Sequence, residues 1–234
     1  MFGKRTGKHR RTTSALAALY SNSDAEVYRT IRTNIQFLAN IRDAKAILVT
    51  SAKPDEGKST VLSNLGIVFA QSGKKVLLID GDLRKPTLHQ LFKLSNLNGL
   101  SDYLIGQCAA EECILSTNVE DLFVLPSGTI PPNPSELLAS PKFKKRLQEL
   151  KMMFDLIFID SPPVLSVTDP LVLTQVVDGV IFLINAKRTT IPVARKALKT
   201  LQHVDAKVLG ILANRISATS DEYSYDSDYA APST

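Results

Sequence analysis

Residues 51–60 read SAKPDEGKST, and this stretch decides how the rest of the chain is interpreted. It follows the apolar run Ala46–Val49, which predicts a buried strand, and it precedes residues 61–71, which predict a helix. A loop between a strand and a helix N-terminus presents backbone N–H groups and positive potential to a polyphosphate. We therefore expect a phosphate-binding loop in which Lys58 reaches the terminal phosphates of a nucleoside triphosphate and Ser59 lies on Mg²⁺.

The composition is that of an ordinary soluble protein, with 234 residues of which 44% are hydrophobic. This length suits one large α/β domain better than two domains. No apolar run approaches the ~18 residues of a membrane span, and no signal-peptide segment follows the first charges. The sequence therefore predicts a cytoplasmic protein. Cys108 and Cys113 are the only cysteines, and we expect ordinary packing residues rather than a zinc site.

Charge is distributed unevenly along the chain, so the net charge of +5 says little about the central domain. Residues 217–234 contain acids but no Lys or Arg, whereas the first eleven positions are basic, with Lys4, Arg5, Lys8, Arg10 and Arg11. The basic head is compatible with a solvated terminus or with attraction to anionic lipid, worth roughly 1 kcal/mol per basic residue. No nucleic acid partner is expected, because the chain has no recognition motif and no basic patch interleaved with aromatic residues.

Strand and helix patterns alternate through the centre of the chain. Strands are expected at 46–50, 75–80, 122–125, 156–160, 180–185 and 208–214, and helices at 24–40, 58–71, 100–104, 134–153, 169–176 and 191–203. Several strands are near-continuous runs of Val, Ile, Leu and Phe, which are typical of strands buried on both faces of a parallel sheet. The predicted fold class is α/β, with a doubly wound, mostly parallel sheet.

Two more predicted strands end in aspartate, at Asp80 and Asp160, and Asp82 follows two residues after the first. Ligands of open parallel sheets lie outside the carboxyl ends of the strands, so we expect these acids near Mg²⁺ and the terminal phosphate. One acid can support the metal while another accepts a proton from an incoming hydroxyl. Arg84 is expected to contact phosphate. A single strand-end Asp is also compatible with a turn or a helix N-cap.

Together these motifs resemble those of the bacterial tyrosine kinases, or BY-kinases, which occur with capsule and exopolysaccharide synthesis systems. Residues 51–60, 76–84 and 157–163 are similar to the Walker A, Walker A′ and Walker B motifs of that family. The family's ExxRxxR signature is matched by Glu26, Arg29 and Arg32, and its C-terminal tyrosine cluster by residues 221–229. The resemblance covers nearly all of the chain after about residue 24.

The resemblance implies a P-loop NTPase fold with deviant Walker motifs, and ATP-dependent phosphorylation of tyrosine with Mg²⁺. It implies a nucleotide site made of Ala52, Lys53, Asp55, Glu56, Gly57, Lys58, Ser59, Thr60 and Asn214. It places the metal on Ser59, Asp80 and Asp160. Asp82 would activate the tyrosine hydroxyl, assisted by Asp80, Lys58 and Arg84. Two points stay open: Asn214 is also compatible with a turn, and Asp55 stands where the family more often has Gly.

The predicted organisation is a basic flexible segment (1–23), a P-loop kinase domain with an N-terminal oligomerisation helix (24–216) and a tyrosine-rich flexible tail (217–234). The resemblance makes Tyr223, Tyr225 and Tyr229 phosphoacceptors. It also implies that the helix face with Glu26, Arg29 and Arg32 contacts a neighbouring subunit in a ring, so that phosphorylation is intermolecular. The alternative for this face is a solvated stripe with a Glu–Arg pair worth ~0.2–0.5 kcal/mol.

The chain resembles the form of these kinases that is separate from its membrane sensor. The implied partners are the cytoplasmic segment of a membrane polysaccharide co-polymerase, which activates the kinase, further copies of the chain, and a protein-tyrosine phosphatase. The implied location is peripheral, at the inner face of the membrane. Two other functions fit the phosphate loop: an ATP-dependent switch like the division-site and chromosome-partition ATPases, and a catalytically silent adaptor.

Overall fold

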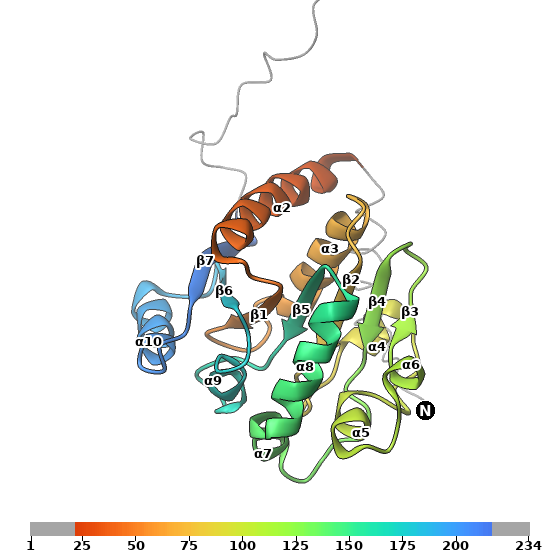
Figure 1. The fold of residues 1–234 in the computed structure, drawn as a ribbon. Helices are drawn as coiled ribbons and strands as arrows, with labels where there is room; N and C mark the ends of the chain where they lie inside the picture. Colours follow the sequence, from red (N-terminus) through yellow and green to blue (C-terminus); the bar gives the residue numbers. More distant parts are fainter. Residues whose placement is uncertain (1–21, 217–234) are drawn as a thin grey trace, which may run out of the picture.

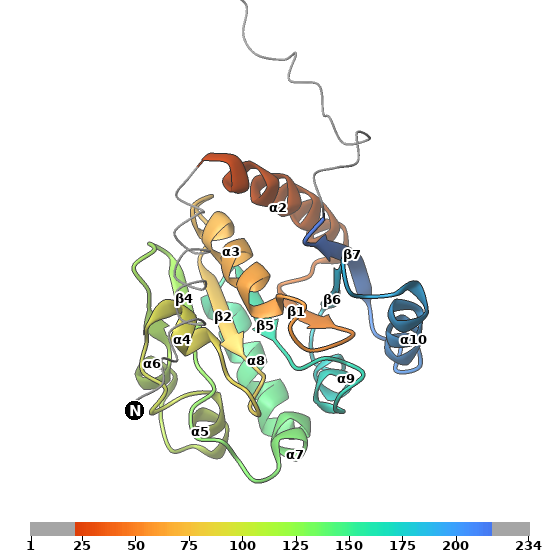
Figure 2. The same cartoon turned by 180° about the vertical axis from the view of Figure 1, so that it is seen from behind.

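A seven-stranded sheet runs through the centre of the molecule, with helices on both of its faces (Figures 1 and 2). The structure is a computed structural model that describes residues 22–216. Most of the predicted basic segment, and the tail with Tyr223, Tyr225 and Tyr229, lie outside the described residues.

The strand order is β3-β4-β2-β5-β1-β6-β7, and every neighbouring pair is parallel except β3 and β4. The strands are β1 (Ala46–Ser51), β2 (Val76–Asp80), β3 (Leu115–Ser116), β4 (Leu122–Leu125), β5 (Leu156–Asp160), β6 (Gly179–Asn185) and β7 (Val208–Asn214). The chain places strands on both sides of β1, which is the arrangement of a doubly wound sheet. This confirms the predicted fold class.

Helices follow most of the strands. They are α2 (Asn22–Arg42), α3 (Lys58–Ala70), α4 (Leu88–Phe92), α5 (Leu100–Ile105), α6 (Ala110–Cys113), α7 (Pro134–Ala139), α8 (Pro141–Met153), α9 (Asp169–Leu173) and α10 (Ile191–Gln202). The sequence did not predict α4, α6 or β3, which are two to five residues long. Helix α2 begins at Asn22, two residues before the predicted start at residue 24.

The core has two layers, because successive side chains of each strand point to opposite faces of the sheet. Ile47 and Val49 pack in one cluster with apolar residues of α2 and α3. Leu48 packs in the other cluster, with residues of α8, α9 and α10. Since both faces are covered, the central strands are buried along their whole length, and their carboxyl ends are the part of the sheet that can meet a ligand.

The predicted helix at 134–153 is two helices, α7 and α8, which meet at Ser140. Ser140 has extended backbone angles, φ −65° and ψ 144°, and its hydroxyl accepts the N–H of Phe143 at 3.3 Å. Pro141 occupies the first position of α8, where its missing N–H costs nothing. The apolar pattern continues across this break, so the periodicity predicted one helix instead of two. Pro141 was the signal of the break, because the residue before a proline rarely adopts helical angles.

Cys108 and Cys113 lie in the core cluster that includes α5 and α8, which confirms their expected packing role. The structure also joins them as a disulfide, with Cα atoms 6.5 Å apart. The sequence did not predict this bond. The cause is local: α6 turns the chain so that its last residue, Cys113, faces back toward Cys108.

Candidate nucleotide-binding and active site

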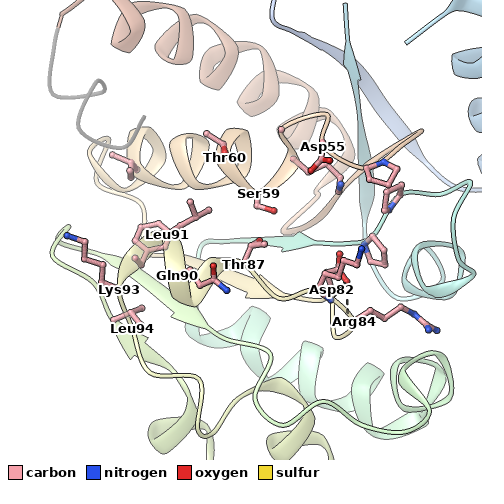
Figure 3. Close-up of a pocket in the computed structure, with 18 of the residues that line it drawn as sticks. Asp55, Ser59, Thr60, Asp82, Arg84, Thr87, Gln90, Leu91, Lys93 and Leu94 are labelled. Atoms are coloured by element: carbon pink, nitrogen blue, oxygen red, sulfur yellow. Dashed lines mark hydrogen bonds between the residues drawn. The ribbon is translucent and has the colours of Figure 1, made fainter. Parts of the chain in front are cut away.

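A cavity of about 1180 Å³ opens at the carboxyl edge of the sheet. The phosphate loop, the residues after β2 and the turn between β3 and β4 supply most of its lining. Figure 3 shows Ser59, Thr87 and Asp82 near the middle and one side of this cavity, and Leu91, Lys93 and Leu94 on the other side. The cavity therefore combines a polar part beside the phosphate loop with a more apolar part beside α4.

Two residues of the phosphate loop have left-handed backbone angles. Gly57, the N-cap of α3, has φ 97°, and Asp55 has φ 61°. Both values lie in the left-handed region, where glycine is unstrained and Asp is tolerated better than most residues. Asp55 therefore adopts the conformation for which the family more often uses glycine. Lys53 is exposed, and Thr60 lines the cavity with Asp55.

Glu56 stabilises the phosphate loop through hydrogen bonds of its buried carboxylate. Its side chain is buried, and its carboxylate accepts the N–H of Ala52 at 3.1 Å and the hydroxyl of Thr189. Glu56 and Ala52 were predicted to bind nucleotide, and the structure shows that they brace the loop. Thr189 was not predicted, because nothing in the sequence connects residues 133 positions apart.

Asn214, at the end of β7, also touches the loop. Its Nδ2 donates to the carbonyl of Glu56 at 2.9 Å, and its Oδ1 accepts the N–H of Arg215 at 2.8 Å. A Cβ atom on Gly57 would collide with Asn214 Nδ2. Asn214 is thus a brace of the phosphate loop, and its contact with the nucleotide stays a prediction.

Helix α3 begins at the loop and points its N-terminus at the cavity. Its first two residues are Lys58, which is buried to 9% exposure, and Ser59, whose hydroxyl donates to Asp160. A 13-residue helix places about half a positive charge at this end, where its first N–H groups have no partner within the helix. Positive potential, free N–H groups and the Lys58 ammonium suit a polyphosphate.

Asp80 and Asp160 are direct partners in the pairing of β2 with β5. Burial, followed by the charge of Asp160, raises the pKa of Asp80 far above its ordinary value, although Thr87 and Leu88 each donate an N–H to it at 2.9 Å. Burial also raises the pKa of Asp160, against the opposing effects of Lys58 and Ser59. Two adjacent buried carboxylates are costly unless a proton or a cation compensates their charge.

The residues present fit a divalent cation. Within residues 22–216, no group of three or more His, Cys, Asp or Glu side chains could hold a metal ion. Asp80 and Asp160 supply two carboxylates, and Mg²⁺ usually takes one or two carboxylates and keeps several waters. Oδ1 of Asp80 is buried and has no hydrogen-bond partner in the described part of the chain. The structure therefore brings Ser59, Asp80 and Asp160 together, and Oδ1 of Asp80 is available to a cation.

Asp82 lines the cavity and is half-buried. Its Oδ1 accepts the N–H groups of Arg84 at 3.2 Å and Lys85 at 2.9 Å. Arg84 also lines the cavity, but its guanidinium forms an ion pair with Asp169 and extends away from Ser59 (Figure 3). The sequence did not predict Asp169; its only local signal is an acid before Pro170 at a helix start, which predicts a cap.

The three residues of the predicted oligomer interface lie on α2 but do not share one exposed face. Glu26 and Arg29 form an exposed ion pair at 2.7 Å. Arg32 is half-buried and donates to the carbonyl of Val68 at 3.2 Å, which ties α2 to the last turn of α3. Arg32 therefore has a role within the subunit that the spacing did not predict. None of the helices between residues 22 and 216 has the length and apolar character needed to cross a bilayer.

The family of the chain follows from its relatives. The AAA domain family matches residues 44–214. The tyrosine-protein kinase YwqD of Bacillus subtilis is 45% identical over 204 residues, which is 86% of each chain. The chain belongs to the bacterial tyrosine kinases. The tyrosine-protein kinase CpsD of Streptococcus agalactiae is 38% identical over 85% of each chain. The crystal structure of the chimerical protein CapA2B2 is 38% identical, with a TM-score of 0.82 over 87% of this kinase and 90% of that chain.

Membership of the bacterial tyrosine kinases establishes the type of reaction that the protein catalyses. This kinase is a transferase that phosphorylates protein tyrosine, and its fold is that of the nucleotide-binding P-loop proteins. The cavity described above is the part of the molecule whose loop, helix N-terminus and strand-end carboxylates match that activity. The prediction of a bacterial tyrosine kinase is confirmed.

Proposed function

We propose that this kinase transfers the terminal phosphoryl group of ATP, with Mg²⁺, to tyrosine, and that its own tail is the first acceptor. The observation that carries this proposal is the pairing of Asp80 with Asp160 beside Ser59, with Asp82 at the same edge and open to the cavity. Mg²⁺ supplies charge neutralisation for the transferring phosphoryl group when it is bound.

Each side chain then has a distinct task. The N–H groups of the phosphate loop and Lys58 bind and orient the phosphates. Asp80 and Asp160 hold the cation, together with Ser59. Asp82 keeps one oxygen, Oδ1, bonded to the backbone, and no hydrogen bond in the described chain occupies Oδ2. Oδ2 is therefore available to accept the proton of a tyrosine Oη, as general base catalysis requires.

The acceptor tyrosines are Tyr223, Tyr225 and Tyr229, within the proposed tail 217–234 that follows the kinase domain 24–216. Half of the six tyrosines of the chain lie in the last twelve residues, among acids and serines that cannot form a core. Among the others, Tyr103 is buried, so it cannot enter an active site without unfolding. Each phosphate would add roughly −1.5 to −2 charges to the tail.

We further propose that subunits phosphorylate one another and that a membrane protein activates them. Support for assembly comes from the exposed Glu26 and Arg29 on α2. Support for an activator is the similarity to CapA2B2, which is a chimerical protein. In this proposal the kinase lies at the inner face of the membrane through that partner, it regulates capsule or exopolysaccharide synthesis, and a protein-tyrosine phosphatase reverses its modification.

Phosphotyrosine mass spectrometry on the full chain with Mg-ATP tests the proposal. The samples include the cytoplasmic segment of a candidate membrane activator. We expect phosphate on Tyr223, Tyr225 or Tyr229, and none in Lys58→Met, which keeps the length of the side chain but loses its charge. Asp82→Asn tests the proton acceptor: nucleotide affinity should change little while the phosphorylation rate falls by roughly 10²–10⁴-fold.

Mixing two variants, neither of which can phosphorylate its own tail, tests whether phosphorylation is intermolecular. Lys58→Met is combined with a variant whose three tail tyrosines are Phe. Phosphate should then appear on the tail of Lys58→Met, because the other variant supplies an active site. A tail that stays unmodified in the wild-type chain, despite ATP binding and an activator, contradicts the proposal, and ATP hydrolysis without phosphotyrosine supports a switch ATPase.

A further inference from the structure

Arg84 is held by a buried carboxylate outside the nucleotide-binding loop. Its Nε donates to Asp169 Oδ2 at 2.8 Å, and its Nη2 donates to Asp169 Oδ1 at 3.1 Å. This is the bidentate geometry in which an Arg–carboxylate pair is both strong and directional. The Asp169 side chain is fully buried, whereas that of Arg84 is 41% exposed.

Ser135 completes the arrangement. Its hydroxyl donates to Asp169 Oδ1 and accepts Nη2 of Arg84 at 3.3 Å. Burial disfavours the charged form of Asp169 most strongly, but the bonds from Arg84 and Ser135 outweigh it and lower the pKa of Asp169. Removal of one partner from a buried pair is costly, so the buried carboxylate depends on both Arg84 and Ser135.

These contacts join three loops at the carboxyl edge of the sheet. Arg84 lies in the loop after β2, Ser135 in the first turn of α7, which follows β4, and Asp169 at the start of α9, which follows β5. Helices α7 and α9 are also packed against each other. The cluster of Arg84, Ser135 and Asp169 therefore fixes the loop after β2 to two rigid elements.

The same loop carries Asp82. The backbone N–H groups of Arg84 and Lys85 both donate to Asp82 Oδ1, so the segment that the Arg84 side chain anchors orients the Asp82 carboxylate. Only one residue, Leu83, separates Asp82 from Arg84, and it is fully buried. A displacement of the Arg84 side chain would therefore move the acid that faces the cavity.

We propose that Asp169 is a positioning residue for tyrosine phosphorylation: it anchors Arg84, and Arg84 in turn orients Asp82. The inference rests on the proposed role of Asp82 as the proton acceptor. The sequence predicted that Arg84 contacts phosphate, whereas this inference gives it the task of orienting Asp82. The reason is that Nε and Nη2 of its guanidinium already donate to Asp169 and Ser135. Arg84 and Asp169 then act as one unit.

A double-mutant cycle on the full chain tests this unit. Asp169→Asn, Arg84→Lys and the double variant are assayed for kcat, and for KM of ATP and of a tyrosine peptide. We expect each single variant to lower kcat by about 10²-fold, the cost of a small misplacement, while KM for ATP stays within about twofold. The double variant should be no slower than either single variant by more than about twofold.

A matched control separates positioning from general stability. Asp178→Asn removes another strongly paired carboxylate, which bonds Lys151 at 2.6 Å and the N–H of Ala46 at the start of β1, the opposite edge of the sheet. It should lower the melting temperature without lowering kcat at a temperature where every variant is folded. Melting curves for all variants define that temperature.

Two results overturn the inference. If the kcat losses of Asp169→Asn and Arg84→Lys multiply, or if Arg84→Lys alone raises KM for ATP, Arg84 contacts phosphate independently of Asp169. If Asp169→Asn keeps a kcat within about twofold of Asp178→Asn, Asp169 has only a structural role. Failure of the proposed function is distinguishable, because Asp82→Asn would then retain the wild-type kcat.

Discussion

At the scale of single residues, the phosphate loop is stabilised by side chains that do not bind phosphate. Glu56 uses its carboxylate on Ala52 and Thr189, and Asn214 uses its amide on the carbonyl of Glu56. The loop can therefore hold its left-handed backbone before any ligand arrives. Preorganisation of this kind saves the ordering entropy that binding would otherwise cost.

Gly57→Ala should test this bracing directly. The substitution places a methyl group against Asn214 Nδ2 and forces an L-residue to φ 97°. We expect the free energy of unfolding to fall by roughly 1–3 kcal/mol and nucleotide affinity to fall with it. Urea unfolding and isothermal titration measure the two quantities.

The Asn214→Ala background separates the two causes. Removing the amide relieves the collision but leaves the backbone strain, so Gly57→Ala should cost less in that background than in the wild-type chain. Equal costs in both backgrounds would mean that Asn214 does not brace the loop. Gly73→Ala, which also has a positive φ but nothing within 4 Å of its added Cβ, is the matched control for strain alone.

At the scale of elements, the parallel strands were predictable, whereas the short helices α4 and α6 were not. Runs such as Val76–Asp80 are buried on both faces, and this leaves a strong apolar signal. The break at Ser140 and the short helices α4 and α6 carry signals of only a few residues, which the longer patterns around them obscure. Helix α4 matters to the site, since the N–H of its first residue, Leu88, donates to Asp80.

The junction between α7 and α9 gives a prediction on pH. Because the pKa of Asp169 is lowered on folding, its ion pair stabilises the protein above the ordinary Asp pKa of about 3.9, and this contribution is lost as pH falls through the lowered folded value. Asp169→Asn should therefore lower the free energy of unfolding by about 1 kcal/mol between pH 5 and 7, after allowance for the partial exposure of Arg84.

Urea unfolding of both proteins at pH 7, 5 and 3.5 measures this difference. The gap between wild type and Asp169→Asn should be constant at the two higher pH values and smaller at the lowest, where the carboxylate begins to be protonated. A gap that widens toward acid would show that Asp169 is not ionised in the folded protein.

At the scale of the whole molecule, the sheet gathers residues that are far apart in the sequence. The sequence predicted Ser59, Asp80, Asp82 and Asp160 at one site because parallel strands end at the same edge. It could not predict Thr189, Ser135 or Asp169, because which loop meets which depends on strand order and on how α7, α9 and α10 pack. The sequence thus predicted the acids at the candidate site, but it did not predict the residues that hold the loops of this site in place.

The adjacent carboxylates of Asp80 and Asp160 also predict that the protein is less stable without a cation than it would be with a neutral residue at one of these positions. Asp80→Asn removes a buried charge and gives the unpartnered Oδ1 position an amide, so we expect the free energy of unfolding at pH 8 without metal to rise by on the order of 1 kcal/mol. With saturating Mg-ATP the wild-type chain should instead be more stable than Asp80→Asn, because a ligand at 100 times its Kd stabilises the wild-type chain by about 2.7 kcal/mol.

Thermal melts with and without Mg-ATP measure both halves of this prediction. Asp155→Asn is the control, since the Asp155 side chain accepts the N–H of Lys75 at the opposite edge of the sheet. Its melting temperature should not rise without metal. If Asp80→Asn is less stable than wild type in both conditions, the Asp80 carboxylate has a structural role that outweighs its cost of burial.

The brace between Asn214 and the phosphate loop also bears on biosynthesis. Glu56 is made 133 residues before Thr189 and 158 residues before Asn214. Domains generally fold as units while the ribosome extends the chain from its N-terminus. A nascent chain that stops before β7 therefore contains the whole Walker sequence but cannot close the loop around it. The nucleotide pocket becomes complete only when translation has passed the last strand, so a truncated translation product cannot form the complete pocket.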